Sequence, residues 1–158
     1  MMQFEKIIFV DADATARSVM AASIMRKEPL QFETEILARG LVVLFPEPVN
    51  QKIEAILANH GLTAKGHEAV QLSADDLSER TLVLVMEEDQ IDKVRAISPR
   101  AEHVYTVGGF VGFSGDIEPL YGADLPTCGK CCEILQGLVK IIVPRLTEED
   151  EIEGVKLW

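Results

Sequence analysis

Residues 6–21 read K-I-I-F-V-D-A-D-A-T-A-R-S-V-M-A. The run from Lys6 to Val10 is short, largely apolar and rich in β-branched residues, which is typical of a strand buried on both faces. From Ala16 to Arg26 the apolar residues follow helical spacing, and Pro29 lies just beyond them. The stretch therefore predicts a buried strand, a polar loop that begins at Asp11, and a helix.

The same alternation of strand and helix continues along the chain. Thr81–Met86 reads T-L-V-L-V-M and indicates another buried strand. Alternating buried strands and amphipathic helices favour an α/β fold of three layers around a central, four-stranded parallel sheet, with the ligand site at the carboxyl ends of the strands. We expect the remaining strands near 34–40 and 103–107 and the remaining helices near 46–60, 88–97 and 128–143.

Length and composition predict one domain with a charged extension. The chain has 158 residues, 47% of them hydrophobic, which suffices for one layered core. We expect this domain to span residues 1–146. Residues 147–158 follow as an acidic tail, with five acids between Glu148 and Glu153, for which a solvated and partly disordered structure is expected.

Charge and cysteine content restrict the possible partners and the compartment. A net charge of −11 without a basic stripe argues against nucleic acid. No apolar run approaches the roughly 18 residues of a membrane span, and no basic leader precedes the first strand, so we expect a cytoplasmic protein without membrane contact. Cys128, Cys131 and Cys132 share one helix face, lack the further ligands of a zinc site, and are expected to be reduced core residues.

Several segments, in order, resemble the low-molecular-weight protein tyrosine phosphatases. In that family a strand runs into a cysteine, five residues, an arginine and a Ser/Thr before a helix, and Arg17 and Ser18 keep this pattern. The resemblance continues through Ala38-Arg39-Gly40-Leu41, through Thr81–Met86, and through G-D-I-E-P-L-Y-G-A-D and C-G-K-C-C. It implies the family fold to about Leu146 and a phosphate-binding loop made of Asp11, Ala12, Asp13, Ala14, Thr15, Ala16, Arg17 and Ser18.

The resemblance also implies roles for residues outside the loop. Glu118 stands where the family places its general acid, and Tyr121 at a position that lines the mouth of the substrate cleft. The departures gather in the loop. Asp11 replaces the nucleophilic cysteine, and further changes are Asp13 for glycine, Ala14 for asparagine, Ala16 for a second cysteine and Val19 for proline, with Ala38 for serine and Leu120 for an aromatic residue elsewhere.

A phosphatase of this kind needs a thiolate nucleophile, and none is present at Asp11. We therefore hypothesise an impaired member of a family of phosphoric monoester hydrolases. This pseudophosphatase would act without a cofactor, through a phosphoprotein, a regulatory protein or another anionic ligand. We further expect Arg17 to form a bidentate pair with Asp11, so that the carboxylate imitates bound phosphate.

Two other interpretations of the loop stay open. Asp11 and Asp13 are also consistent with ordinary caps on the helix that follows. The segment D-A-D-A-T also satisfies the D-x-D-x-T opening of haloacid-dehalogenase-type phosphatases, in which Asp11 would be an aspartyl nucleophile, Asp13 the acid/base and Mg²⁺ the cofactor. Such a site also needs acidic residues later in the chain, and Asp116 and Asp124 match these positions only loosely. A magnesium-dependent reaction on the tyrosine-phosphatase-like fold is the enzymatic alternative.

Overall fold

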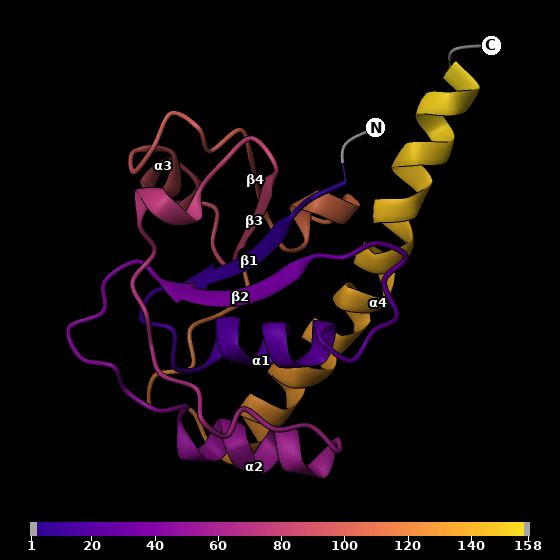
Figure 1. Ribbon diagram of the computed structural model, residues 1–158. Helices are drawn as coiled ribbons and strands as arrows, with labels where there is room; N and C mark the ends of the chain where they lie inside the picture. The colour runs from indigo at the N-terminus through magenta and orange to yellow at the C-terminus, as the bar shows by residue number, and fades with distance from the viewer. Residues whose placement is uncertain (1–2, 157–158) are drawn as a thin grey trace.

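The sheet of this computed structural model contains four parallel strands, as the sequence predicts. The structure describes residues 3–156, and it describes side chains as far as Leu146. The strands are β1 (Lys6–Asp11), β2 (Glu35–Gly40), β3 (Thr81–Val85) and β4 (His103–Thr106), in the order β2-β1-β3-β4 (Figure 1). β1 and β3 are therefore the central strands, and the residues after β1 lie at the carboxyl end of the sheet, where parallel sheets carry their ligand sites.

Helices cover both faces of this sheet and complete three layers. The helices are α1 (Arg17–Met25), α2 (Gln51–Asn59), α3 (Gln90–Arg95) and α4 (Leu125–Lys156), and two short 3-10 turns span Ala74–Asp76 and Gly109–Val111. α1, α2 and α4 lie on one side of the sheet and α3 lies on the other (Figure 1). The α/β architecture that the alternating pattern predicted is thus confirmed.

Strand side chains fill two separate cores, which explains the continuous apolar runs. Ile7 and Phe9 of β1 pack in the larger core with α1 and α4, whereas Ile8 and Val10 pack in the smaller core on the α3 side. Successive residues of a strand point to opposite faces, so a strand covered on both sides must be apolar throughout. All nine residues of α1 are buried, because the helix lies between the sheet and α4.

α4 is longer than its sequence pattern predicted. The helix was expected to end near Val143, before Pro144, but it includes Pro144 and runs to Lys156. Leu146, two residues beyond the proline, is buried in the main core, and this packing favours continuation of the helix. The acidic tail expected from residue 147 is helical as far as Lys156, and the expectation of partial disorder there stays a prediction. Among the described residues, no helix is long and apolar enough to cross a membrane.

The outer edge of β2 is capped by arginine side chains. β2 uses Glu35 N–H to pair with Glu5 O, so the alternate residues Ile36 and Ala38 turn their carbonyl groups away from β1. Arg26 donates from Nε and Nη2 to Ile36 O at 3.1 and 2.7 Å, and Arg39 donates from Nη1 to Ala38 O at 3.0 Å. An unpaired strand edge otherwise invites another strand, so these two guanidinium groups protect the edge.

The three cysteines are buried and free, as the helical spacing predicted. Burial raises the pKa of the Cys131 thiol to about 11 and also raises the pKa values of Cys128 and Cys132. At a pH near 8 we therefore expect thiol reagents to modify the native protein at least about 100-fold more slowly than the urea-unfolded chain. Ellman's reagent measures both rates.

A matched control is Ser114→Cys, which places a fourth thiol on an exposed loop. This added thiol is expected to react rapidly in the native state while the three native thiols stay slow. Rapid native-state reaction of the three native cysteines in the parent would contradict their assignment as inert core residues.

Candidate functional site

The loop from Asp11 to Arg17 joins the carboxyl end of β1 to α1, and its backbone is fixed by neighbouring segments. Leu41 N–H donates to Asp11 O at 3.0 Å, and Asn50 N–H donates to Thr15 O at 2.9 Å. Ala14 has a φ of 60°, a left-handed conformation that costs energy for a residue with a Cβ. Such strain persists only where the surroundings hold it, so this loop has a defined shape.

Asp11 lies inside this loop, and its carboxylate accepts hydrogen bonds from the loop itself. Its Oδ1 accepts from Ala14 N–H at 2.7 Å and from Ser18 Oγ at 2.9 Å, while its Oδ2 accepts from Ser18 N–H at 3.0 Å. The residue is only 2% exposed. Burial raises the pKa of the Asp11 carboxyl, whereas the hydrogen bonds from Ser18 and Ala14 and the charge of Arg17 act in the opposite direction.

These bonds also bear on the helix-cap interpretation. Ser18 lies in the first turn of α1, where N–H groups lack partners within the helix, and Asp11 satisfies one of them. Asp13 does not cap α1, because its Oδ1 accepts from Thr15 N–H at 3.3 Å and from Thr15 Oγ1 at 2.8 Å. The cap interpretation therefore holds for Asp11, which occupies loop donors with its own negative charge.

Arg17 does not form the predicted bidentate pair with Asp11. Its Nη2 donates to Glu87 Oε2 at 2.9 Å and its Nη1 donates to Ile117 O at 2.5 Å. The guanidinium is buried, and among the described residues its ion pair is with Glu87. That expectation is wrong because the competing acceptors sit just after β3 and on the 113–124 connection, which the fold brings against the loop.

Asp13 faces the mouth of the loop together with Tyr121. The Tyr121 hydroxyl donates to Asp13 Oδ2 at 3.4 Å, and the ring is largely exposed. Partial burial raises the pKa of Tyr121, and the negative charge of Asp13 acts in the same direction. Both residues line a small cavity of about 110 Å³, whose full lining is Asp11, Asp13, Thr15, Ala16, Arg17, Asn50, Leu120, Tyr121 and Gly122.

Most of the predicted site residues are brought together, but Glu118 is not. Residues 11–18 run from the end of β1 through the loop into the first turn of α1, and Tyr121 reaches the mouth of this loop. Glu118 is exposed between Ile117 and Pro119, and it does not line the small cavity. The structure thus places the carboxylate at the general-acid position on the correct connection but outside the cavity.

The two aspartates of the D-x-D pattern do not converge on a common point. Asp11 is engaged by Ala14 and Ser18, whereas Asp13 is engaged by Thr15 and Tyr121. Within the part of the chain that the structure describes, no group of three or more His, Cys, Asp or Glu side chains could hold a metal ion. Magnesium prefers several oxygen ligands around one point. The residues of this loop do not form such a set, so they do not fit a magnesium ion.

The sequence did not predict three of the residues that contact the loop. Glu87 pairs with Arg17, Asn50 N–H holds Thr15 O, and His67 Nε2 lies 2.7 Å from Ala14 O, where the Nε2–H tautomer donates. The position of Glu87, directly after a buried parallel strand, was a usable signal. Nothing in the local sequence marks Asn50 or His67, because their contacts with the loop span long stretches of chain.

Gly40 is needed where β2 passes the loop. A Cβ at this position would lie 2.7 Å from the Asp13 carbonyl carbon and from Val43 Cγ2, and 2.9 Å from Ala14 N. We expect Gly40→Ala to lower the free energy of unfolding by about 1–3 kcal/mol, because backbone atoms of the loop would have to shift. Urea unfolding followed by circular dichroism measures the loss.

Gly137→Ala is the matched control for this substitution. A Cβ at Gly137 in α4 meets nothing within 4 Å, so the change is expected to be neutral or to stabilise by up to about 1 kcal/mol through helix propensity. Equal effects of the two substitutions would show that the close approach of the loop to Gly40 is unimportant.

Comparison with known proteins agrees with this geometry. The family model described as low molecular weight phosphotyrosine protein phosphatase matches residues 6–151. A probable low molecular weight protein-tyrosine-phosphatase EpsP of Ralstonia nicotianae is 26% identical over 141 residues, which cover 89% of this chain and 94% of that protein. The low molecular weight protein-tyrosine-phosphatase Etp of Escherichia coli is 28% identical over 98 residues, which cover 62% of this chain and 65% of that protein.

Solved structures show the same fold. The low molecular weight protein tyrosine phosphatase of T. tengcongensis superposes with a TM-score of 0.82 at 28% identity, covering 92% of this chain and 99% of that chain. The YwlE arginine phosphatase of Geobacillus stearothermophilus superposes with a TM-score of 0.84 at 24% identity, covering 92% and 94%. A haloacid-dehalogenase ancestry is therefore excluded, and the chain belongs to the low molecular weight phosphotyrosine protein phosphatase family.

Proposed function

We propose that this chain is a pseudophosphatase, a family member that does not hydrolyse phosphate esters and acts by binding a regulatory protein partner in the cytoplasm. The observation that carries the proposal is the carboxylate of Asp11 at the position of the nucleophile. It is buried, and it already accepts hydrogen bonds from Ala14 and Ser18. A carboxylate held in this way is a poor replacement for an exposed thiolate and repels a phosphoryl dianion.

The engagement of Arg17 supports the same proposal. In the family mechanism the arginine of the loop binds phosphoryl oxygens, but here its guanidinium donates to Glu87 and to Ile117 O. A phosphoryl group would have to compete with a buried ion pair for this side chain. Together with Asp13 at the mouth, this pairing leaves little positive potential for an anion, so a protein partner is favoured over a free phosphate or a phosphoprotein.

An exposed apolar loop beside the mouth supports a protein partner. Leu44 and Phe45 are 81% and 68% exposed, and Val42 and Tyr121 are also exposed. Val42 N–H donates to Ala12 O, so this loop is joined directly to the altered phosphate loop. A groove of about 580 Å³ adjoins both loops and is lined in part by Ala12, Leu41, Val42, Pro119 and Tyr121. Clustered exposed apolar side chains usually mark an interaction surface.

The experiment that tests the proposal measures hydrolysis of p-nitrophenyl phosphate by the purified protein with EDTA and, separately, with Mg²⁺. The expected result is a rate at the uncatalysed background under both conditions, because neither a thiolate nor an assembled metal site is available. Turnover that depends on Mg²⁺ and is lost in Asp11→Ala would overturn the proposal and assign Asp11 as an aspartyl nucleophile or a metal ligand.

A further inference from the structure

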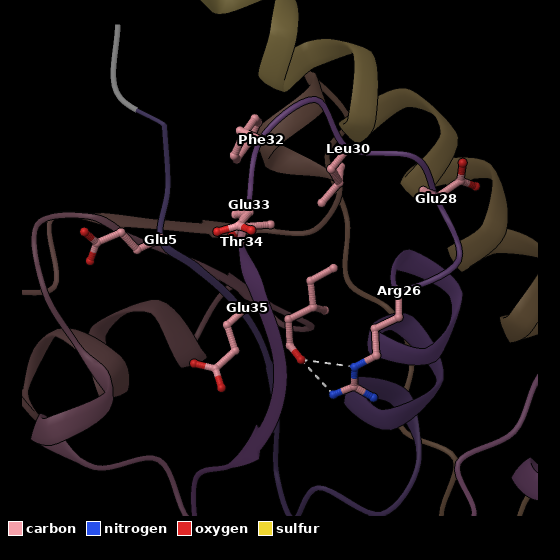
Figure 2. A pocket seen from close by; sticks show the side chains of 9 residues that line it. Glu5, Arg26, Glu28, Leu30, Phe32, Glu33, Thr34 and Glu35 are labelled. Carbon is pink, nitrogen blue, oxygen red and sulfur yellow. Dashed lines mark hydrogen bonds between the residues drawn. The ribbon is translucent and has the colours of Figure 1, made fainter.

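A second groove lies at the opposite end of the sheet from the altered loop. It is formed by the end of α1, the 26–34 connection and the beginning of β2, and its volume is about 710 Å³. Figure 2 shows the side chains that line it, with Arg26 on one side and Glu5, Glu33 and Glu35 on the other. Asp11 and Gly40, which border the altered loop, are the last residues of β1 and β2, whereas this groove begins at the first residue of β2.

The charge around this groove is strongly negative. Glu28, Glu33 and Glu35 line it, and among the described residues none of the three has an ion-pair partner. Glu5 is paired with Arg80 at 3.2 Å. Among the described residues that line the groove, Arg26 is the one cation, and it donates to the backbone carbonyl of Ile36 rather than to a carboxylate (dashed lines from Arg26 in Figure 2). An occupant with several positive charges would complement this surface.

The groove also offers an apolar floor. Leu30, Phe32 and Ile36 are only partly buried and pack against the main core, so each keeps an accessible face on a rigid support. Thr34 Oγ1, between them, is buried without a hydrogen-bond partner. Apolar side chains set inside a charged rim form the usual arrangement of a protein interaction surface, and Phe32 can in addition receive a cation over its ring.

The occupant cannot simply add as a further β-strand to the sheet. Ile36, Ala38 and Gly40 are the residues of β2 whose backbone groups face away from β1. The carbonyl oxygens of Ile36 and Ala38 are capped by Arg26 and Arg39, and Gly40 is hydrogen-bonded to the backbone of Val70 and Leu72. Recognition by strand addition depends on such free main-chain groups. The contacts available to an occupant are therefore those of side chains, with carboxylates at the rim and the three apolar residues below.

We propose that this groove is a second interaction surface and that it takes a segment of a partner protein in which lysine or arginine alternates with large apolar residues. The basic side chains pair with Glu28, Glu33 and Glu35, and the apolar side chains rest on Leu30 and Phe32. This surface does not depend on the pseudophosphatase assignment, because it lies at the other end of the sheet and shares no residue with the altered loop.

A labelled peptide Lys-Phe-Lys-Leu-Lys-Phe-Lys tests the proposal in fluorescence anisotropy titrations of the whole protein at near-physiological salt. We expect saturable binding that weakens about tenfold when Glu28, Glu33 and Glu35 are all changed to glutamine, since exposed ion pairs each contribute modestly. A peptide with serine in place of its phenylalanine and leucine residues is expected to bind at least about tenfold more weakly, because the apolar contacts are lost.

Two control variants test whether binding depends on the acids of this groove. The triple variant Asp92→Asn, Glu102→Gln and Glu133→Gln removes the same charge from exposed acids that do not line the groove, and it is expected to change the affinity less than about twofold. Asp13→Asn tests the mouth of the altered loop and is expected to leave the affinity unchanged. Equal weakening by both triple variants, loss of binding in Asp13→Asn, or no binding by the parent would each overturn the proposal.

Discussion

Replacing Arg17 with alanine is expected to lower the free energy of unfolding by about 2–3 kcal/mol. The side chain is 4% exposed and joins three distant segments, because it carries its own loop, pairs with Glu87 and donates to Ile117 O. Its removal takes this donor from the Ile117 carbonyl and the cationic partner from the Glu87 carboxylate, and the cost is moderated by the 24% exposure of Glu87 and by Gln90 Nε2, which still donates to Glu87 Oε2. Urea unfolding followed by circular dichroism measures the change.

Arg100→Ala is the matched control, since it also breaks an arginine–glutamate pair. Arg100 and Glu79 are about half exposed, so their pair is screened by water and its loss is expected to lower the free energy of unfolding far less than the loss of Arg17 does. Arg17→Lys is expected to be intermediate, because one ammonium group cannot reproduce the planar fork that reaches two acceptors. If Arg17→Ala proves as mild as Arg100→Ala, then Arg17 is not a structural residue and its pairing with Glu87 is weak in solution.

Replacing Asp11 with cysteine is expected to create hydrolysis of p-nitrophenyl phosphate. The substitution removes the carboxylate, frees the N–H groups of Ala14 and Ser18 for a phosphoryl oxygen, and leaves the Ser18 hydroxyl to stabilise a thiolate. We expect kcat/KM to exceed that of the parent by at least about 100-fold, which corresponds to about 2.7 kcal/mol of activation free energy. Orthovanadate, an oxyanion that resembles phosphate in shape and charge, should inhibit the variant.

Asp13 limits this gain, and a double variant measures by how much. Its carboxylate stays at the mouth of the loop and repels the substrate dianion, so Asp11→Cys with Asp13→Gly should be about tenfold more active than Asp11→Cys alone. Asp11→Ser is the control, because a hydroxyl without an activating base should leave the background rate unchanged. A folded Asp11→Cys protein that neither reacts nor binds vanadate would mean that the loop cannot cradle a phosphoryl group.

The order of strands and helices could be predicted because each depends on local pattern. β1 and β3 read as continuous apolar runs, and the helices follow from spacing and from proline. The short 3-10 turn at Ala74–Asp76 depends on an equally local contact, because Ser73 N–H donates to Asp76 Oδ2 at 3.1 Å as part of a capping box. The end of α4 was the exception, because the burial of Leu146 outweighed the local signal of Pro144.

The details of the site could be predicted only where the contacts are local. Asp11 and Ser18 are seven residues apart, and the preference of carboxylates for free N–H groups at a helix start made Asp11 a candidate cap, although Ser18 was not identified as the donor. The partners of Arg17 are 70 and 100 residues away, and one of them is a backbone carbonyl, which every residue possesses. Such an acceptor leaves no mark in a sequence, so the nearer carboxylate of Asp11 was the natural but incorrect choice.

The strand order β2-β1-β3-β4 has a consequence for how the chain folds during its synthesis. The central strand β1 is made about seventy residues before its partner β3, and all pairs are parallel, so no early hairpin can form. At about 5–20 residues per second, β1 and α1 must wait several seconds on the ribosome before the apolar face of α1 is covered by α4. The nascent chain therefore carries an exposed, aggregation-prone first unit until its last helix emerges.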